Sequence, residues 1–86
     1  MPSADVLKEI HRLVQGNRYE ISAHAAKRAI ERGAGERDIV SALITATRAT
    51  WQEQHQTWNV EGEDTDGDPL TVAVVIEAYL VVVTLF

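Results

Sequence analysis

Three basic side chains at four-residue spacing are the part of this sequence best suited to chemistry. His24, Arg28 and Arg32 lie in a segment with the pattern of a helix, and their spacing places all three on one helical face. Histidine exchanges protons near neutral pH, and arginine binds phosphate oxygens through paired N–H donors. The pattern therefore predicts a phosphate-binding face with a proton-transfer group, and Lys27 adds a further positive charge.

The same residues also fit a structural role. Arg28 and Arg32 could pair with Glu31 or Glu61, and such ion pairs within one helix contribute only about 0.2–0.5 kcal/mol each. A cation near the C-terminal end of a helix also interacts favourably with the helix dipole, which suits Arg32. His24, in the first turn, could simply hydrogen-bond to a neighbouring strand. The functional and structural interpretations both stay open at this point.

The acidic segment 63–68 does not have the pattern of a calcium-binding loop. Such a loop places its glycine differently and ends in a bidentate glutamate, whereas this segment has Gly67 near its end and no glutamate at the position where such a loop would end. We interpret it as a hairpin turn. His11, His24 and His55 lie far apart in the sequence and lack the close pairing typical of zinc motifs. The sequence therefore predicts neither a metal site nor a cofactor.

The composition limits the classes of function. The 86 residues suggest one domain spanning residues 1–86. The formal net charge of -5 argues against a protein that coats nucleic acid non-specifically, which would need an excess of Lys and Arg. No apolar run is long enough to span a membrane and no secretion signal is visible, so we expect a cytoplasmic protein. The absence of cysteine excludes disulfides and thiol chemistry.

Helical periodicity is typical of the first half of the chain, about residues 4–48. A second helix is predicted after Ser22, a suitable N-cap, and Gly33 can close it in the left-handed conformation. A third helix should run from about Glu36 to near Thr47. The first helix is predicted from an apolar stripe made of Val6, Leu7, Ile10, Leu13 and Val14.

The second half, about residues 49–86, has the pattern of strands. Aromatic and β-branched residues alternate with polar ones, and later form continuous apolar runs. The expected strands cover residues 50–53, 56–61, 70–76 and 80–86. Because the helices precede the strands, we predict an α+β fold, with about three helices packed on one face of an antiparallel sheet of about four strands. Trp51 and Trp58 should fill the space between helix and sheet, although exposed aromatic side chains can also stack on bases.

Two motifs follow one another along the chain from Tyr19 onward. The first motif has an apolar residue, Ser, His, Arg and Arg-Gly at fixed spacing, and the second has an acidic turn before paired strands. The matching residues are Ile21, Ser22, His24, Arg28, Arg32 and Gly33, then Gly62, Asp64, Asp66, Gly67, Val82, Val83 and Thr84. In this order and spacing the two motifs resemble those of a small bacterial family, the domain of unknown function 4258, and the resemblance covers nearly all of the chain from Tyr19 onward.

This family in turn resembles the RelE/BrnT-like toxins, whose active members cut RNA without a metal. The resemblance implies that His24 acts as acid or base and that Arg28 holds the phosphate. Arg32 would assist Arg28, while Thr84 and Tyr79 would offer hydroxyl groups. It also implies RNA as a substrate and an antitoxin-like protein as a partner.

Two classes of function follow. The first is a toxin-like ribonuclease, or a weakened relative, that works through the face carrying His24 and Arg28. The second is a non-enzymatic module that binds a protein or a phosphate, or forms a homodimer through an open strand edge, and in which the motif of His24, Arg28 and Arg32 is structural. The basic face favours the first class, whereas the acidic net charge and the apolar C-terminal residues favour the second.

Overall fold

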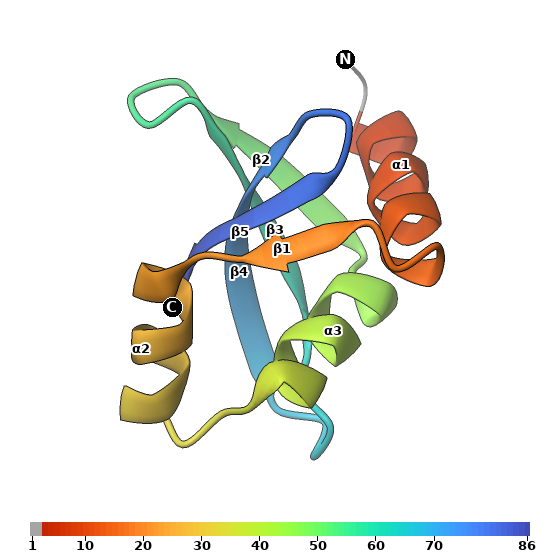
Figure 1. The fold of residues 1–86 in the computed structure, drawn as a ribbon. Coiled ribbons are helices and arrows are strands. Elements are labelled where there is room, and N and C mark those ends of the chain that lie inside the picture. The colour runs from red at the N-terminus through yellow and green to blue at the C-terminus, as the bar shows by residue number, and fades with distance from the viewer. Residues whose placement is uncertain (1–2) are drawn as a thin grey trace.

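The computed structural model describes residues 3–86, which form three helices and five strands (Figure 1). The helices are α1 (Ser3–Gln15), α2 (Ala23–Glu31) and α3 (Glu36–Thr45). The strands are β1 (Tyr19–Ile21), β2 (Arg48–Gln52), β3 (Thr57–Glu63), β4 (Pro69–Ile76) and β5 (Leu80–Leu85). The α+β class and the three helices are confirmed. None of these helices has the length and hydrophobicity needed to cross a lipid bilayer.

The five strands form one mixed sheet in the order β1-β5-β4-β3-β2. The last four strands are antiparallel neighbours, as expected. β1 runs parallel to β5, with Tyr19 beside Leu80 and Ile21 beside Val82. The prediction of about four antiparallel strands is therefore only roughly met: β2 to β5 form the antiparallel part, and β1 adds a parallel edge strand that the sequence analysis did not include. β1 has only three residues, too few for a periodic pattern, and its partner lies far along the chain.

The acidic segment forms the turn between β3 and β4, as predicted. Asp64 Oδ1 accepts hydrogen bonds of 2.9 Å from the backbone N–H groups of Asp66 and Asp68, and Gly67 adopts a φ of +85°. One carboxylate oxygen from each of Asp64, Asp66 and Asp68 lies within 4.8 Å of the other two. The turn itself accounts for this proximity, because aspartate side chains commonly accept hydrogen bonds from the backbone that follows them.

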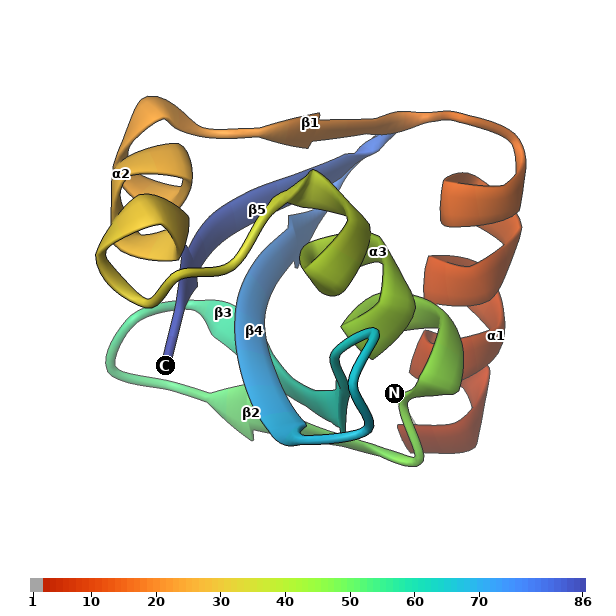
Figure 2. The same ribbon diagram turned by 90° about the horizontal axis from the view of Figure 1, so that it is seen from below.

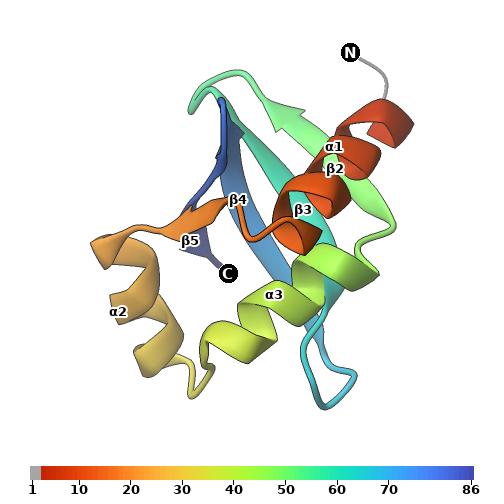
Figure 3. The same ribbon diagram turned by 45° about the vertical axis from the view of Figure 1, so that its right-hand side comes forward.

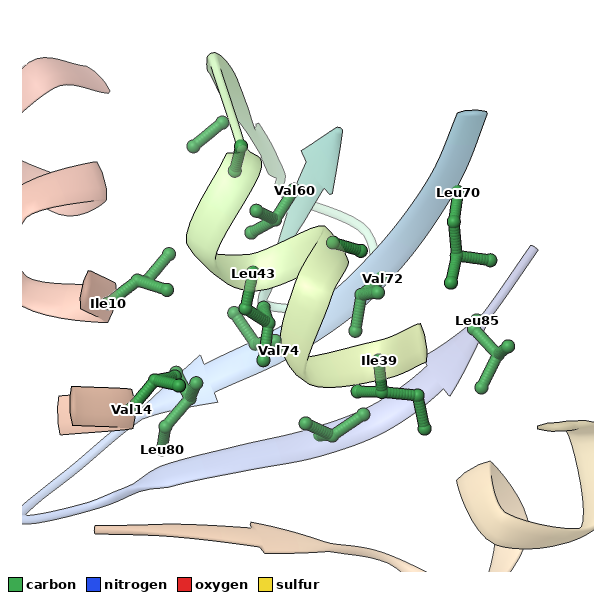
Figure 4. Close-up of a cluster of buried hydrophobic side chains, with 14 of the residues drawn as sticks. Ile10, Val14, Ile39, Leu43, Val60, Leu70, Val72, Val74, Leu80 and Leu85 are labelled. Atoms are coloured by element: carbon green, nitrogen blue, oxygen red, sulfur yellow. The ribbon is translucent and has the colours of Figure 1, made fainter. Parts of the chain in front are cut away.

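α1 and α3 cover one face of the sheet (Figure 3). Buried aliphatic side chains fill the space between these helices and the sheet (Figure 4). β3 and α3 approach closely at Gly62, where an added Cβ atom would lie 1.9 Å from the carbonyl oxygen of Ala42. The core is aliphatic, and its largest fully buried side chains include Ile10, Leu13, Ile39, Leu43, Leu80 and Leu85. Burying one such side chain contributes about 1.5–3 kcal/mol.

α2 stands apart from the other two helices and packs mainly against β5 (Figure 3). Its buried residues are Ala25 and Ala29, small side chains that let the helix backbone approach the fold closely. The expectation that the helices cover one face is met by α1 and α3 only. α2 lies at the end of β5. The face of α2 that carries His24 and Arg28 is turned toward the surface of the sheet that α1 and α3 leave uncovered.

Candidate functional site

A shallow hollow of about 640 Å³ lies between α2, the loop joining β2 to β3, and the end of β5. Figure 2 shows α2, this loop and the C-terminus on the same side of the molecule. The volume of the hollow falls within the range typical of small-molecule sites. The polar residues that line it are His24, Arg28, Gln52, His55, Thr57, Asn59 and Thr84.

Ser22 fixes the position of α2 relative to β5. Its side-chain oxygen accepts a hydrogen bond of 3.1 Å from the backbone N–H of Ala25, which caps the helix as predicted. The same hydroxyl donates to the carbonyl oxygen of Val83 at 3.0 Å. The backbone N–H of Ser22 donates to the carbonyl oxygen of Val82. One residue thus begins the helix and attaches it to the strand, which sets where His24 lies.

His24 and Arg28 form the helical wall of the hollow. Within residues 3–86 the His24 side chain makes no hydrogen bond or ion pair, so the imidazole is available to a ligand. Arg28 Nη1 lies 3.7 Å from Glu31 Oε1, and 41% of the Arg28 side chain is exposed. The pair with Glu31 considered from the sequence is therefore formed, but a long and solvent-exposed ion pair holds the guanidinium only weakly.

The floor of the hollow is the open face of the sheet. Gln52 pairs with Thr57 across β2 and β3, and Asn59, Ala73 and Thr84 lie side by side across β3, β4 and β5. All of these residues line the hollow, so their side chains point away from the core. The side chains of Gln52, Asn59 and Thr84 form no hydrogen bond with any residue of the described chain.

His55 also lines the hollow, although no sequence pattern predicts this position. It lies in the loop between β2 and β3, where its backbone N–H donates to the carbonyl oxygen of Gln52 and the next residue, Gln56, has a φ of +55°. We considered His55 only as a metal ligand and found no suitable spacing. The cross-strand pairing of β2 with β3 is the signal that could have located this loop beside the polar face of the sheet.

Three other predicted residues do not line this hollow. Arg32 is the C-cap residue of α2, and its side chain and that of Lys27 are exposed. Tyr79 lies in the turn between β4 and β5, roughly 17 Å along the chain direction from Thr84 at about 3.3 Å per residue. The structure therefore brings His24, Arg28 and Thr84 together, without Arg32, Lys27 or Tyr79.

The two tryptophans lie on the other face of the sheet. Trp51 and Trp58 are cross-strand neighbours with ring centroids 5.2 Å apart and planes inclined by 59°. Trp58 packs against the hydrophobic core and Trp51 is 40% exposed. Their location beside α1, near Glu9, supports a packing role and separates them from the hollow.

Hydrogen bonds around the start of α3, outside the hollow, shift two pKa values. Bonds from the backbone N–H of Gly35, and from the hydroxyl and backbone N–H of Thr65, lower the pKa of the Asp38 carboxyl. A 2.8 Å hydrogen bond to the Glu36 carboxylate raises the pKa of the Tyr19 phenol. These bonds attach β1 and the turn after β3 to α3, so their role is structural.

No protein family model matches this chain, and no curated protein shows significant similarity to it. The resemblance to the domain of unknown function 4258 therefore stays a prediction from the two motifs.

Proposed function

We propose that this protein binds RNA at the hollow and cleaves it without a metal ion. The observation that carries the proposal is the convergence of His24, Arg28 and His55, from two distant parts of the chain, on one hollow. Two imidazoles can supply a base and an acid, and a guanidinium can hold a phosphate. Among the described residues, none that lines the hollow is acidic. The hollow therefore suits an anion despite the negative net charge of the protein.

The reaction would transfer the phosphodiester to the neighbouring 2′-hydroxyl. One histidine removes the proton of the 2′-hydroxyl, and that oxygen attacks phosphorus. The bond between phosphorus and the 5′ oxygen breaks, and the other histidine protonates this leaving oxygen. The products are a 2′,3′-cyclic phosphate and a free 5′-hydroxyl, while Arg28 stabilises the negative charge that builds up on the phosphate oxygens.

Thr84 supports the same proposal in a smaller role. Its hydroxyl has no hydrogen-bond partner among the described residues and lies in the hollow with His24. A hydroxyl there can donate to a phosphate oxygen or hold a water molecule. We assign it to substrate positioning, because a threonine hydroxyl is neither a strong acid nor a strong base.

The test is cleavage of a labelled oligoribonucleotide in the presence of EDTA, with analysis of the product ends. We expect cyclic phosphate ends, and no cleavage of a DNA oligonucleotide of the same sequence because it lacks the 2′-hydroxyl. Arg28→Ala should slow cleavage by about 100-fold. Arg32→Ala is the matched control, since it removes the same charge one helical turn away, outside the hollow. An equal loss of cleavage rate in Arg28→Ala and Arg32→Ala would contradict a specific role for Arg28.

A second candidate function is binding of a protein partner. Ile30 on α2 is 78% exposed and borders a shallow, mainly apolar hollow between α2 and α3 that includes Ile39. A large exposed aliphatic side chain next to such a surface is typical of interaction sites. If the isolated protein cuts no RNA and Ile30→Ser abolishes self-association in sedimentation measurements, this second function is supported.

A further inference from the structure

The hollow continues into a second one on the open face of the sheet. The second hollow has a volume of about 330 Å³, and Gln52, Asn59 and Phe86 line both. Thr50, Glu61 and Thr71 complete its lining. A ligand larger than a phosphate ion could therefore extend from the end carrying His24 across the face of β2, β3 and β4.

The shared residues have the chemistry of nucleobase recognition. Phe86 is 49% exposed, and its backbone N–H donates to the carbonyl oxygen of Thr71 at 2.8 Å, which holds this residue beside β4. An exposed aromatic ring offers a surface on which a base can stack. The amides of Gln52 and Asn59 have no hydrogen-bond partners among residues 3–86, and each offers a donor and an acceptor to a base edge.

Charge gives the two hollows different preferences. The first has Arg28 and two histidines and no acidic lining residue. The second has Glu61, whose carboxylate lies 3.4 Å from Arg48 Nε, and it has no cation among its own lining residues in the described chain. A phosphate should therefore bind at the α2 end of the first hollow, whereas a neutral group should bind in the second hollow.

We propose that Phe86, Gln52 and Asn59 form a subsite for one unpaired nucleobase next to the phosphate held by Arg28. The inference rests on the proposed function, since it names the part of the RNA that lies beside the cleaved phosphate. It adds that the substrate is single-stranded, because a base must leave its stack to lie on Phe86. It also assigns base preference to the two amide side chains.

The experiment compares the affinities of uridine 3′-monophosphate, adenosine 3′-monophosphate, ribose 5-phosphate and inorganic phosphate by titration calorimetry. The nucleotides should bind at least about tenfold more tightly than ribose 5-phosphate, as expected for one stacked base. Phe86→Ala should remove this tenfold difference without changing the affinity for ribose 5-phosphate. Phe86→Leu should also remove the tenfold difference, because it keeps the apolar bulk but not the aromatic ring on which a base stacks. Asn59→Ala should change the ratio of the two nucleotide affinities.

Tyr79→Ala is the matched control, because Tyr79 is a similarly exposed aromatic residue outside both hollows and its loss should change no affinity. The inference is overturned if the nucleotides bind no more tightly than ribose 5-phosphate, including the case in which neither binds. Cleavage of RNA decides separately about the proposed function. RNA is still cut if only the base subsite is wrong, and it is not cut if the whole site is wrong.

Discussion

Replacing Gly62 with alanine should destabilise the protein severely, because β3 passes too close to α3 for any side chain. The added Cβ atom would lie 1.9 Å from the carbonyl oxygen of Ala42 and 2.7 Å from its carbonyl carbon. These atoms belong to the helix backbone, so no side-chain rotation can relieve the overlap. The helix and the strand must separate by more than about 1 Å, in a core that is packed as densely as a crystal of small molecules.

Overpacking of a core typically costs 1–3 kcal/mol, occasionally more. A clash with rigid backbone belongs at the upper end, so we expect a loss of about 3 kcal/mol or more for Gly62→Ala. One kcal/mol shifts the melting temperature of a domain of this size by roughly 4–8 °C. The melting temperature should therefore fall by roughly 12–24 °C, or the variant should fail to fold.

Thermal unfolding followed by circular dichroism measures this loss. Gly35→Ala is the control, because an added Cβ atom there has no neighbour within 4 Å and the backbone φ is −114°. Its cost should stay below about 1 kcal/mol. If Gly62→Ala melts within a few degrees of Gly35→Ala, then β3 and α3 do not approach as described and the packing argument is refuted.

Substitutions at two further positions test how the helices are held. Ser22→Ala should destabilise the protein by about 1–2 kcal/mol, since it removes a helix cap and a bond to the carbonyl oxygen of Val83, whereas Ser22→Thr should retain most of the stability in urea unfolding. Asp38 has a pKa below the ordinary 3.8, so its contribution is present above that value and is lost as the pH falls through the lowered pKa. Asp38→Asn should therefore make stability less dependent on pH between about pH 2 and pH 5, and an unchanged pH dependence would contradict the role of its hydrogen bonds with Gly35 and Thr65.

Local patterns in the sequence predict much of the fold. The apolar stripe of the first helix, the Ser22 cap and the alternation around Trp58 depend on neighbours within a few residues, and the corresponding elements are present. β1 could not be predicted in this way. Its three residues become a strand only because β5 offers a parallel edge, and that pairing joins segments at opposite ends of the chain.

The site was predictable only in part, because one of its walls depends on strand pairing. Helical spacing is enough to place His24 and Arg28 on one face. Thr84 faces the same hollow because the pairing of β4 with β5 shifts register next to Ala73. Simple alternation would have put Thr84 on the core side with Val82. No local pattern signals such an irregularity, and none links His55 to His24.

The rate of RNA cleavage in EDTA by single and double histidine variants tests the central claim most directly. If His24 and His55 act as one acid–base pair, His24→Gln and His55→Gln should each slow cleavage by about 10²–10⁴-fold. The double variant should be little slower than either single one, because residues that act as a unit are not additive. All three variants must keep the melting temperature of the wild type within a few degrees. The account is contradicted if both single variants cleave RNA at the wild-type rate, or if the wild-type protein cleaves no RNA.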